Sequence, residues 1–332
     1  MERADILILG AGLAGLSTAR HLERAGRASV ILDRAARPGG RLATRTVGED
    51  LVDDGPVFGH GRSSAFLAAA QEASAEPLLR WPEVVRGSGP TCSPRALHAE
   101  RFAFRQGMNH FAAQLAAGLD LRRSVQVTGL ERAADGWIVR TNGPVFSART
   151  VVVTFPAPQT SALIAPVAPA LAALLGMVTV VPCLTLVAQL PLDAPDPGFD
   201  LCLPERSPAV QLIANDSQKR LAPRARTLVI QARAAWSAER LEVDASSWAA
   251  QLLDAARPLC PTLERASIVE RPQRWRYARI VGPGLAAPTL AAFPGGAYLG
   301  LAGEAFDASA GMEGAWRSGL RLAQQIVDER IA

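Results

Sequence analysis

The sequence predicts an α/β protein in which a Rossmann-type dinucleotide-binding domain is interrupted by a mostly antiparallel β-sheet domain with helices. Four observations predict this fold. Residues 5–26 form an apolar strand, a glycine-rich turn and a helix, and residues 121–154 alternate like a β-hairpin and a following strand. An apolar strand and an amphipathic helix end the chain. Residues 156–290 lack regular strand–helix alternation, which indicates an inserted domain.

The N-terminal segment predicts a compact strand–helix–strand unit. DILIL at residues 5–9 and SVILD at residues 29–33 are short apolar runs typical of buried strands. Residues 13–26 carry apolar side chains at helical spacing and end on Gly26, a residue type typical of helix C-termini.

Three glycines between the first strand and the helix fit the pattern G-x-G-x-x-G. Gly10 permits a tight turn, Gly12 lets the backbone approach a pyrophosphate, and Gly15 lets the helix pack closely on the strand. The helix N-terminus directs free N–H groups at the phosphates. Asp33 ends the second strand, where its carboxylate can accept both ribose hydroxyls and would repel a 2′-phosphate. This order predicts a dinucleotide site, against the alternative of a packing motif without a ligand.

The remaining elements follow from periodicity and turn residues. A helix is predicted at 106–119 and a hairpin turn at Asp135–Gly136. Strands are predicted at 184–190, 209–215, 227–236 and 297–304, and helices at 247–259 and 313–332. The dinucleotide domain is therefore expected to be discontinuous, with residues 1–60, 100–156 and 291–332, and the substrate domain is expected to hold residues 61–99 and 157–290.

Composition excludes several classes of protein. The net charge is +4, Lys219 is the only lysine, and no basic run indicates a nucleic-acid surface. The four cysteines and four histidines show no metal-ligand spacing, so no metal is expected. Neither a secretory signal nor an apolar run of about 20 residues is evident, and we expect a cytoplasmic protein without membrane contact.

The residues after Asp33 favour FAD over NAD. Gly39 and Gly40 bring backbone close to the cofactor, and the Arg41 guanidinium can neutralise a pyrophosphate. Near the C-terminus, Glu304 stands at a strand end and a helix begins at about 311–313. A helix N-terminus stabilises the charge that builds on an isoalloxazine during reduction. FAD is longer than NAD, and this remote segment suits the longer cofactor.

The arrangement resembles the FAD-dependent amine oxidase superfamily and, within it, the renalase family. The resembling segments run through most of the chain: GAGLAGLSTA, RPGGRLATR, the D-x-G at Asp53–Gly55, RQGMNHFAAQLAAGLDL, TFPAPQT, NDSQKR, ARAAWSAERLE, QRWRYAR and GMEGAWRSGLRLAQ. The resemblance implies an FAD domain of the glutathione-reductase and amine-oxidase type with the substrate domain inserted into it. It also implies non-covalent FAD, because no cysteine or histidine stands at a flavin-linking position.

The resemblance implies which residues contact FAD. Pro56 and Val57 would run beside the flavin, Val125 would offer backbone groups to the adenine, and Met312 with Glu313 would lie under the flavin pyrimidine. The full implied set is Gly10, Gly12, Leu13, Ala14, Gly15, Asp33, Arg34, Gly40, Arg41, Pro56, Val57, Val125, Gly303, Glu304, Met312, Glu313 and Ala315.

The chain departs from the renalase pattern at three places. Where relatives carry D-x-G-A-Q-Y, this chain has DDGPVF, so Val57 and Phe58 replace a glutamine and a tyrosine. Glu304 replaces an aspartate and Gln273 replaces a histidine. FAD binding tolerates these changes, whereas the identity of the substrate is left open.

The expected function is that of a renalase-like FAD-dependent oxidase. It would take a hydride from a small reduced substrate, an isomeric dihydronicotinamide such as 2- or 6-dihydro-NAD(P), and pass it to O2 to give H2O2. The alternatives are a flavin amine oxidase, another flavin dehydrogenase of secondary metabolism, and a non-catalytic flavin-binding protein. The electron acceptor and the oligomeric state stay open.

No catalytic residue is assigned from the sequence. The candidates for the pocket wall are Phe58, Trp236, Trp275 and Tyr277, although aromatic side chains more often belong to a core. Lys219 is a candidate for a water-mediated contact with flavin N5, although its segment resembles one that lies away from N5. A group of arginines, Arg274, Arg276 and Arg279, can bind a phosphate or carboxylate, although surface arginines are the commoner case.

Overall fold

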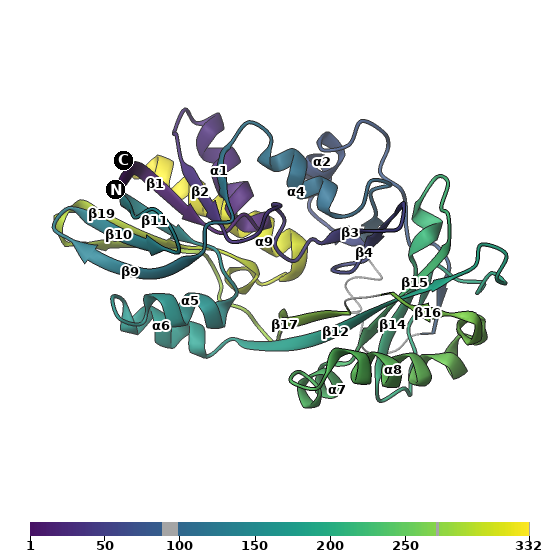
Figure 1. Cartoon of the computed structure of the whole chain (residues 1–332). Helices are drawn as coiled ribbons and strands as arrows, with labels where there is room; N and C mark the ends of the chain where they lie inside the picture. The colour runs from purple at the N-terminus through teal and green to yellow at the C-terminus, as the bar shows by residue number, and fades with distance from the viewer. Residues whose placement is uncertain (88–98, 270–271, 332) are drawn as a thin grey trace. The chain divides into compact units, whose positions relative to one another are not determined.

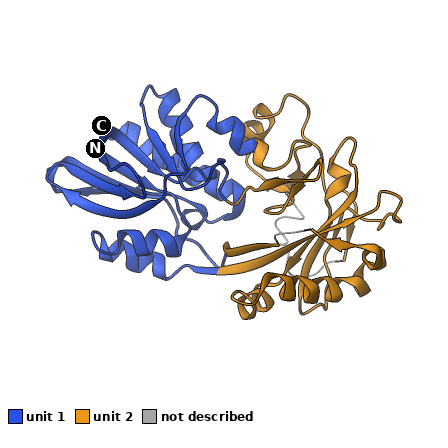
Figure 2. Ribbon diagram, viewed as in Figure 1, with its two compact units in different colours: residues 1–40, 111–180, 280–332 blue, residues 41–110, 181–279 orange. Residues whose placement is uncertain are grey.

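The computed structural model of the protein describes residues 1–87, 99–269 and 272–331 (Figure 1). It divides into two compact units, coloured separately in Figure 2. Unit 1 holds residues 1–40, 111–180 and 280–332, and unit 2 holds residues 41–110 and 181–279.

Unit 1 is the Rossmann-type unit. Its described residues form an eight-stranded sheet in the order β18-β19-β11-β1-β2-β8, with β10 paired to β11 and β9 paired to β10. Its elements are β1 (Glu2–Leu9), α1 (Leu13–Arg24), β2 (Val30–Asp33), β8 (Asp120–Arg123), β9 (Val127–Ala133), β10 (Gly136–Thr141), β11 (Phe146–Val153), α5 (Ala157–Ile164), α6 (Pro169–Gly176), β18 (Thr289–Phe293), η4 (Pro294–Gly296), β19 (Ala297–Leu301), η5 (Glu304–Phe306) and α9 (Gly311–Asp328).

The centre of the unit 1 sheet is parallel, because β1 pairs in parallel with both β11 and β2, and β11 does so with β19. Parallel strands covered on both faces read as continuous apolar runs, and Leu7, Ile8 and Leu9 are fully buried. Helices α1 and α9 pack together: the Ser17 hydroxyl donates to the Trp316 carbonyl at 2.8 Å. The predicted strand–turn–helix–strand order at residues 5–33 is confirmed.

Unit 2 is built around a mostly antiparallel sheet. Its described residues form seven strands in the order β16-β12-β15-β14-β13-β6, with β17 paired to β12. The elements are β3 (Thr44–Val47), β4 (Asp50–Asp53), β5 (Gly59–Gly61), α2 (Ser64–Glu72), β6 (Val85–Arg86), β7 (Glu100–Phe102), β13 (Leu201–Cys202), β14 (Val210–Asn215), η1 (Asp216–Lys219), β15 (Arg226–Ala232), α7 (Ala234–Glu239), α8 (Ala245–Ala256), η2 (Arg257–Leu259), η3 (Pro261–Arg265) and β16 (Ser267–Ile268). The elements α4 (Asn109–Ala116), β12 (Thr179–Leu190) and β17 (Gln273–Val281) cross the bounds of the units.

The two faces of the unit 2 sheet differ in chemistry. Leu184 and Leu186 of β12 belong to a buried core with Trp248 and Leu252 of α8. Because side chains alternate along a strand, the intervening residues face the other side, and among them is Thr185. The sheet is therefore apolar under α8 and partly polar on its opposite face.

The structure corrects the predicted strand at 227–236. Strand β15 ends at Ala232, and helix α7 begins at Ala234. The sequence AAWSAE consists largely of helix-favouring residues, and the Ser237 N–H donates to the Arg233 carbonyl at 2.9 Å to close the first turn.

The units differ from the expected domain bounds in four places, because residues 41–60 and 100–110 lie in unit 2 and residues 157–180 and 280–290 lie in unit 1. Residues 41–60 lie in unit 2, where β3 pairs with β4 and β5 pairs with β7. Residues 157–180 lie in unit 1, because Ile164 of α5 and Leu175 of α6 are buried in its core.

Within the described residues, no helix is long and apolar enough to cross a membrane.

Candidate active site

The glycine turn of unit 1 is built as a cradle. Gly10 has φ of +109°, which glycine alone adopts readily. A Cβ on Gly15 would lie 2.0 Å from the Gly10 carbonyl oxygen, so this position requires glycine for packing. A Cβ on Gly12 would meet nothing within 4 Å, and φ of −75° there imposes no strain. Packing therefore explains Gly10 and Gly15, whereas the space beside Gly12 is open for a ligand.

The first turn of α1 adds donors to this cradle. Gly12 caps the helix without a side-chain hydrogen bond, and the turn holds no acidic side chain. Among the described residues, the backbone N–H groups of Leu13, Ala14 and Gly15 have no hydrogen-bond acceptor. Free N–H groups and the helix dipole attract anions, so the arrangement fits a pyrophosphate.

A second glycine pair packs against this turn. The Gly39 N–H donates to the Ala11 carbonyl at 2.8 Å, and Gly39 forms an isolated bridge with Gly12. Gly40 has φ of +57°, and a Cβ there would lie 3.3 Å from the Gly12 Cα. The Gly39–Gly40 pair is therefore part of the architecture of the turn as well as a candidate for cofactor contact.

Asp33 lies at the end of β2 and binds the same turn. Its carboxylate accepts the Ala11 N–H at 2.6 Å and the Ala35 N–H at 2.7 Å. The Val125 N–H donates to the Asp33 carbonyl at 2.9 Å, which leaves the Val125 carbonyl as its candidate contact with an adenine. Arg34 is exposed. The geometry brings Asp33, Val125 and the glycine turn together, as a dinucleotide site requires.

The C-terminal candidates lie in η5 and at the start of α9. Glu304 is buried and accepts the Ile280 N–H at 2.7 Å, and Gly303 has φ of +149°. Glu313 is buried in the first turn of α9, while Met312 and Ala315 are half-buried.

Sequence reasoning missed the residue that fixes this C-terminal segment. Asp307 is fully buried, and it accepts Arg317 Nε at 2.7 Å and the Ser309 hydroxyl at 2.7 Å. Burial opposes its ionisation, but the bonds from Arg317 and Ser309 prevail and lower the pKa of Asp307.

The remaining candidates belong to unit 2. Arg41 donates from Nη1 to the carbonyl of Ala278 on β17 at 3.0 Å. Phe58 is buried, and its ring centroid lies 6.4 Å from that of Trp81 at an edge-to-face angle. Lys219 is also fully buried, with Nζ 4.8 Å from the Trp81 ring centroid. The structure thus brings Phe58 and Lys219 to a common neighbour.

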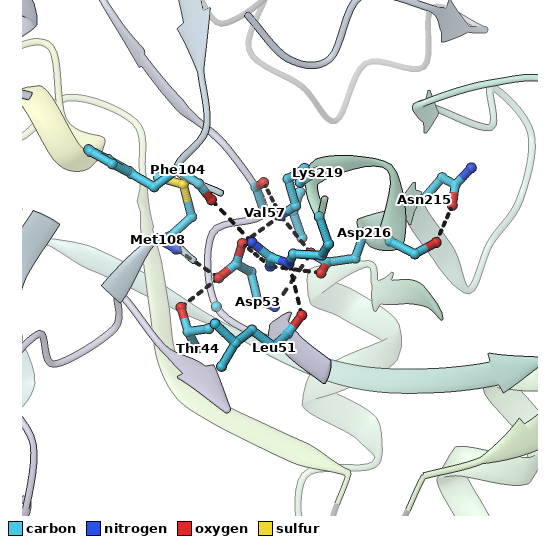
Figure 3. A network of polar contacts seen from close by, with 12 residues as sticks. Thr44, Leu51, Asp53, Val57, Phe104, Met108, Asn215, Asp216 and Lys219 are labelled. Carbon is cyan, nitrogen blue, oxygen red and sulfur yellow. Dashed lines mark hydrogen bonds and ion pairs between the residues drawn. The ribbon is translucent and has the colours of Figure 1, made fainter. Parts of the chain in front are cut away.

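Lys219 belongs to a buried network of four charged groups (Figure 3). Its ammonium lies 2.6 Å from Asp53 Oδ2 and 2.5 Å from Asp216 Oδ1, and it donates to the Val57 carbonyl at 2.9 Å. Arg220 Nη2 lies 2.9 Å from each of the same two carboxylates. An ammonium has three donors, and these three acceptors occupy all of them. The geometry therefore favours a positioning role for Lys219 over a water-mediated contact.

The two carboxylates of the network differ in their ionisation. Burial disfavours the charged form of Asp53, but Lys219 and Arg220 together lower its pKa, with help from the Thr44 hydroxyl at 2.6 Å. Burial outweighs the same two cations at Asp216 and raises its pKa. The negative charge of Asp53 adds to the rise in the pKa of Asp216, whereas the Thr44 hydroxyl helps to lower that of Asp53.

The segment that follows β4 is held by side-chain donors from three elements. Trp275 Nε1 of β17 donates to the Asp54 carbonyl at 2.8 Å, and Gln231 Nε2 of β15 donates to the Gly55 carbonyl at 2.7 Å. Lys219 of η1 holds the Val57 carbonyl. Pro56 and Val57, the implied flavin neighbours, therefore lie in a backbone segment fixed in one conformation.

Cys92 and His98 lie outside the described residues. Among the residues that are described, no group of histidine, cysteine and acidic side chains can hold a metal ion.

The glycine cradle, Asp33 and the parallel sheet define a Rossmann-type dinucleotide-binding unit, and comparisons with known proteins assign the chain to a family. Residues 8–72 match the model of the NAD(P)-binding Rossmann-like domain, and residues 84–327 match that of the flavin-containing amine oxidoreductases. The second match covers most of the chain, so the protein belongs to the flavin-containing amine oxidoreductase family.

Individual relatives are similar over shorter stretches. The chain is 51% identical to a lysine-specific histone demethylase 1 homolog 2 of Oryza sativa subsp. japonica over 47 residues, which is 14% of this chain and 6% of that protein. It is 34% identical to a putrescine oxidase of Kocuria rosea over 79 residues, which is 24% of this chain and 16% of the relative. The chain thus spans well under two thirds of these curated relatives.

A solved structure of putrescine oxidase bound to putrescine is similar in fold, with a TM-score of 0.69 and 16% sequence identity. The superposition covers 98% of this chain and 99% of the putrescine oxidase chain. At that identity the likeness shows the fold alone.

Proposed function

We propose that the protein is a renalase-like oxidase that binds FAD non-covalently and oxidises a small, reduced, anionic ring compound, with isomeric dihydronicotinamides such as 2- or 6-dihydro-NAD(P) as the substrate class. FAD, when bound, supplies the acceptor for the hydride, and the electrons pass on to O2 to give H2O2. The ring nitrogen's lone pair drives hydride loss, so no general base is required from the chain.

The charge of unit 2 is the observation that carries this proposal. Each buried carboxylate that the structure describes in unit 2 already has donors: Asp53 and Asp216 bind Lys219 and Arg220. Asp54 lies 3.1 Å from Arg45 Nε, and Asp50 accepts two backbone N–H groups. A cationic amine would be desolvated there without a carboxylate of its own, and an unpaired buried charge is costly.

The chain's own part is to position the reacting groups and to exclude water. Val57 and Phe58 are buried apolar residues where renalase relatives carry polar ones. The fixed carbonyls of Asp54, Gly55 and Val57 hold this apolar segment in place, so it can present a constant, dry surface to a planar ring.

A flavin amine oxidase is the second candidate, because the family match and the 34% identity to a putrescine oxidase over 79 residues favour amines. Anaerobic mixing of the FAD-loaded protein with 6-dihydro-NAD(P), benzylamine or putrescine separates the two. We expect the dihydronicotinamide to bleach the flavin absorbance rapidly and, once air is admitted, one H2O2 to form for each substrate oxidised. Bleaching by the amines alone would replace this proposal with the amine oxidase, and no bleaching by any donor would favour a non-catalytic flavin protein.

A further inference from the structure

Strand β17 separates the three arginines of the segment QRWRYAR by the face on which they lie. Arg274 donates to the Leu241 carbonyl at 3.1 Å, and Arg276 lies 2.6 Å from the Glu242 carboxylate. Both therefore face the chain that follows α7. Side chains alternate along a strand, so Arg279 lies on the opposite face, together with Trp275 and Tyr277.

Arg279 has a different environment from the other two. Its Nη2 donates to Oε1 of Gln211, a buried residue of β14. The Arg279 charge also acts on the buried Cys183 thiol of β12. Burial raises the pKa of this thiol, and the Arg279 charge partly offsets the rise. Among the described residues, no carboxylate lies within ion-pair distance of Arg279. A partly buried guanidinium is thus fixed by a neutral amide while its charge lacks a counterion.

We propose that Arg279, held by Gln211, is the specificity-determining group that binds a phosphate or carboxylate oxygen of the substrate. This inference rests on the proposed oxidation of an anionic ring compound and deepens it. Tyr277 precedes Arg279 by two residues on the same face of β17, so the strand offers an aromatic side chain and a cation about 7 Å apart. That spacing suits a planar ring that carries an anionic group at a short distance.

The test uses the full-length FAD-loaded protein with two reduced substrates. One is the 6-dihydro form of nicotinamide mononucleotide, which carries a phosphate, and the other is a neutral N-alkyl dihydronicotinamide. In Arg279→Gln, we expect the half-saturating concentration of the phosphate-bearing substrate to rise about 10- to 100-fold, because a charge-assisted hydrogen bond is lost. The limiting rate of flavin reduction and the response to the neutral substrate should stay near wild type.

Two further variants make the test specific. Arg279→Lys keeps the charge but loses the planar fork, and its half-saturating concentration should fall between those of wild type and Arg279→Gln. Arg276→Gln removes an arginine from the opposite face of the same strand and should leave both substrates unaffected. Equal weakening toward both substrates in Arg279→Gln, or weakening in Arg276→Gln as well, would overturn the assignment.

A binding measurement separates this inference from the proposed function. Oxidised nicotinamide mononucleotide cannot reduce flavin, and calorimetric titration reports its affinity for the oxidised protein without any redox step. Weaker binding to Arg279→Gln than to Arg276→Gln would support the anion site even if no dihydronicotinamide bleached the flavin. Equal binding to the two variants would refute the site even if the oxidase activity were found.

Discussion

Asp54 shows how one side chain in the fixed segment can respond to pH. It is nearly completely buried, and its carboxylate lies 3.1 Å from Arg45 Nε. Burial disfavours the charged form more strongly than Arg45 favours it, and the pKa of Asp54 rises to about 6 from its ordinary value of 3.8. Between about pH 4 and pH 6, the folded protein therefore holds a proton at Asp54 that the unfolded chain has already lost.

This difference makes a stability prediction with a definite sign. Between pH 4 and pH 6 the native state binds more protons at Asp54 than the unfolded state, so the free energy of unfolding falls as pH rises through that window. Asp54→Asn removes the titration. We expect the stability of Asp54→Asn relative to wild type to rise by about 3 kcal/mol between pH 4 and pH 7, measured by denaturant unfolding at each pH. A difference that is independent of pH would contradict the prediction.

Single residues also show what the sequence can and cannot predict. Asp33 can be predicted as a cofactor contact because it follows the glycine turn at a fixed spacing, and this role stays a prediction. The partners of Lys219 were not, since Asp53 lies 166 residues away and no local pattern links them. Arg274 and Arg276 were indistinguishable from Arg279 by type, and only the contacts of β17 separate them.

At the scale of the element, the glycines in the strand–turn–helix of unit 1 have different functions. Gly10 and Gly15 are required by the backbone and its packing, whereas the space beside Gly12 is open for a ligand. A Cβ added to Gly15 would collide with the Gly10 carbonyl oxygen, whereas a Cβ added to Gly12 would enter open space. The structure agrees with the roles predicted for Gly10 in the turn and Gly15 in packing, and the contact of Gly12 with a pyrophosphate stays a prediction.

Two alanine variants of this turn should behave differently. Gly12→Ala should leave the thermal stability of the FAD-free protein near wild type and weaken FAD binding at least about 10-fold, because its methyl group occupies the space for the pyrophosphate. Gly15→Ala should destabilise the FAD-free protein itself by about 1–3 kcal/mol through overpacking. Thermal melts without FAD and fluorescence titration with FAD measure the two effects. Normal FAD affinity in Gly12→Ala would show that the turn does not hold the cofactor.

At the scale of the whole molecule, the two units have separate cores and separate polar supports. The core of unit 1 contains Leu7 and Val151, and the core of unit 2 contains Leu186 and Trp248. The class of each unit followed from sequence periodicity. The bounds of the units did not follow from periodicity, because residues 41–60 join unit 2 through strand pairing and ion pairs that form only in the folded chain.

The Lys219 network is the polar support of unit 2, and its loss should affect that unit selectively. Lys219→Met would leave the buried carboxylates of Asp53 and Asp216 with Arg220 as their only cation. Removing one partner of a buried ion pair costs about 3–5 kcal/mol, whereas an exposed pair contributes under about 1 kcal/mol. Arg276→Met, which breaks the exposed pair with Glu242, is the matched control.

Hydrogen exchange with peptide resolution can locate the effect. In Lys219→Met, we expect the amides of residues 181–279 to lose protection while those of β1 and β11 in unit 1 keep it, since compact units with their own cores open separately. Arg276→Met should exchange like wild type throughout. Uniform loss of protection across both units would mean that the molecule opens as one cooperative body, and no loss in residues 181–279 would show that the network does not support unit 2.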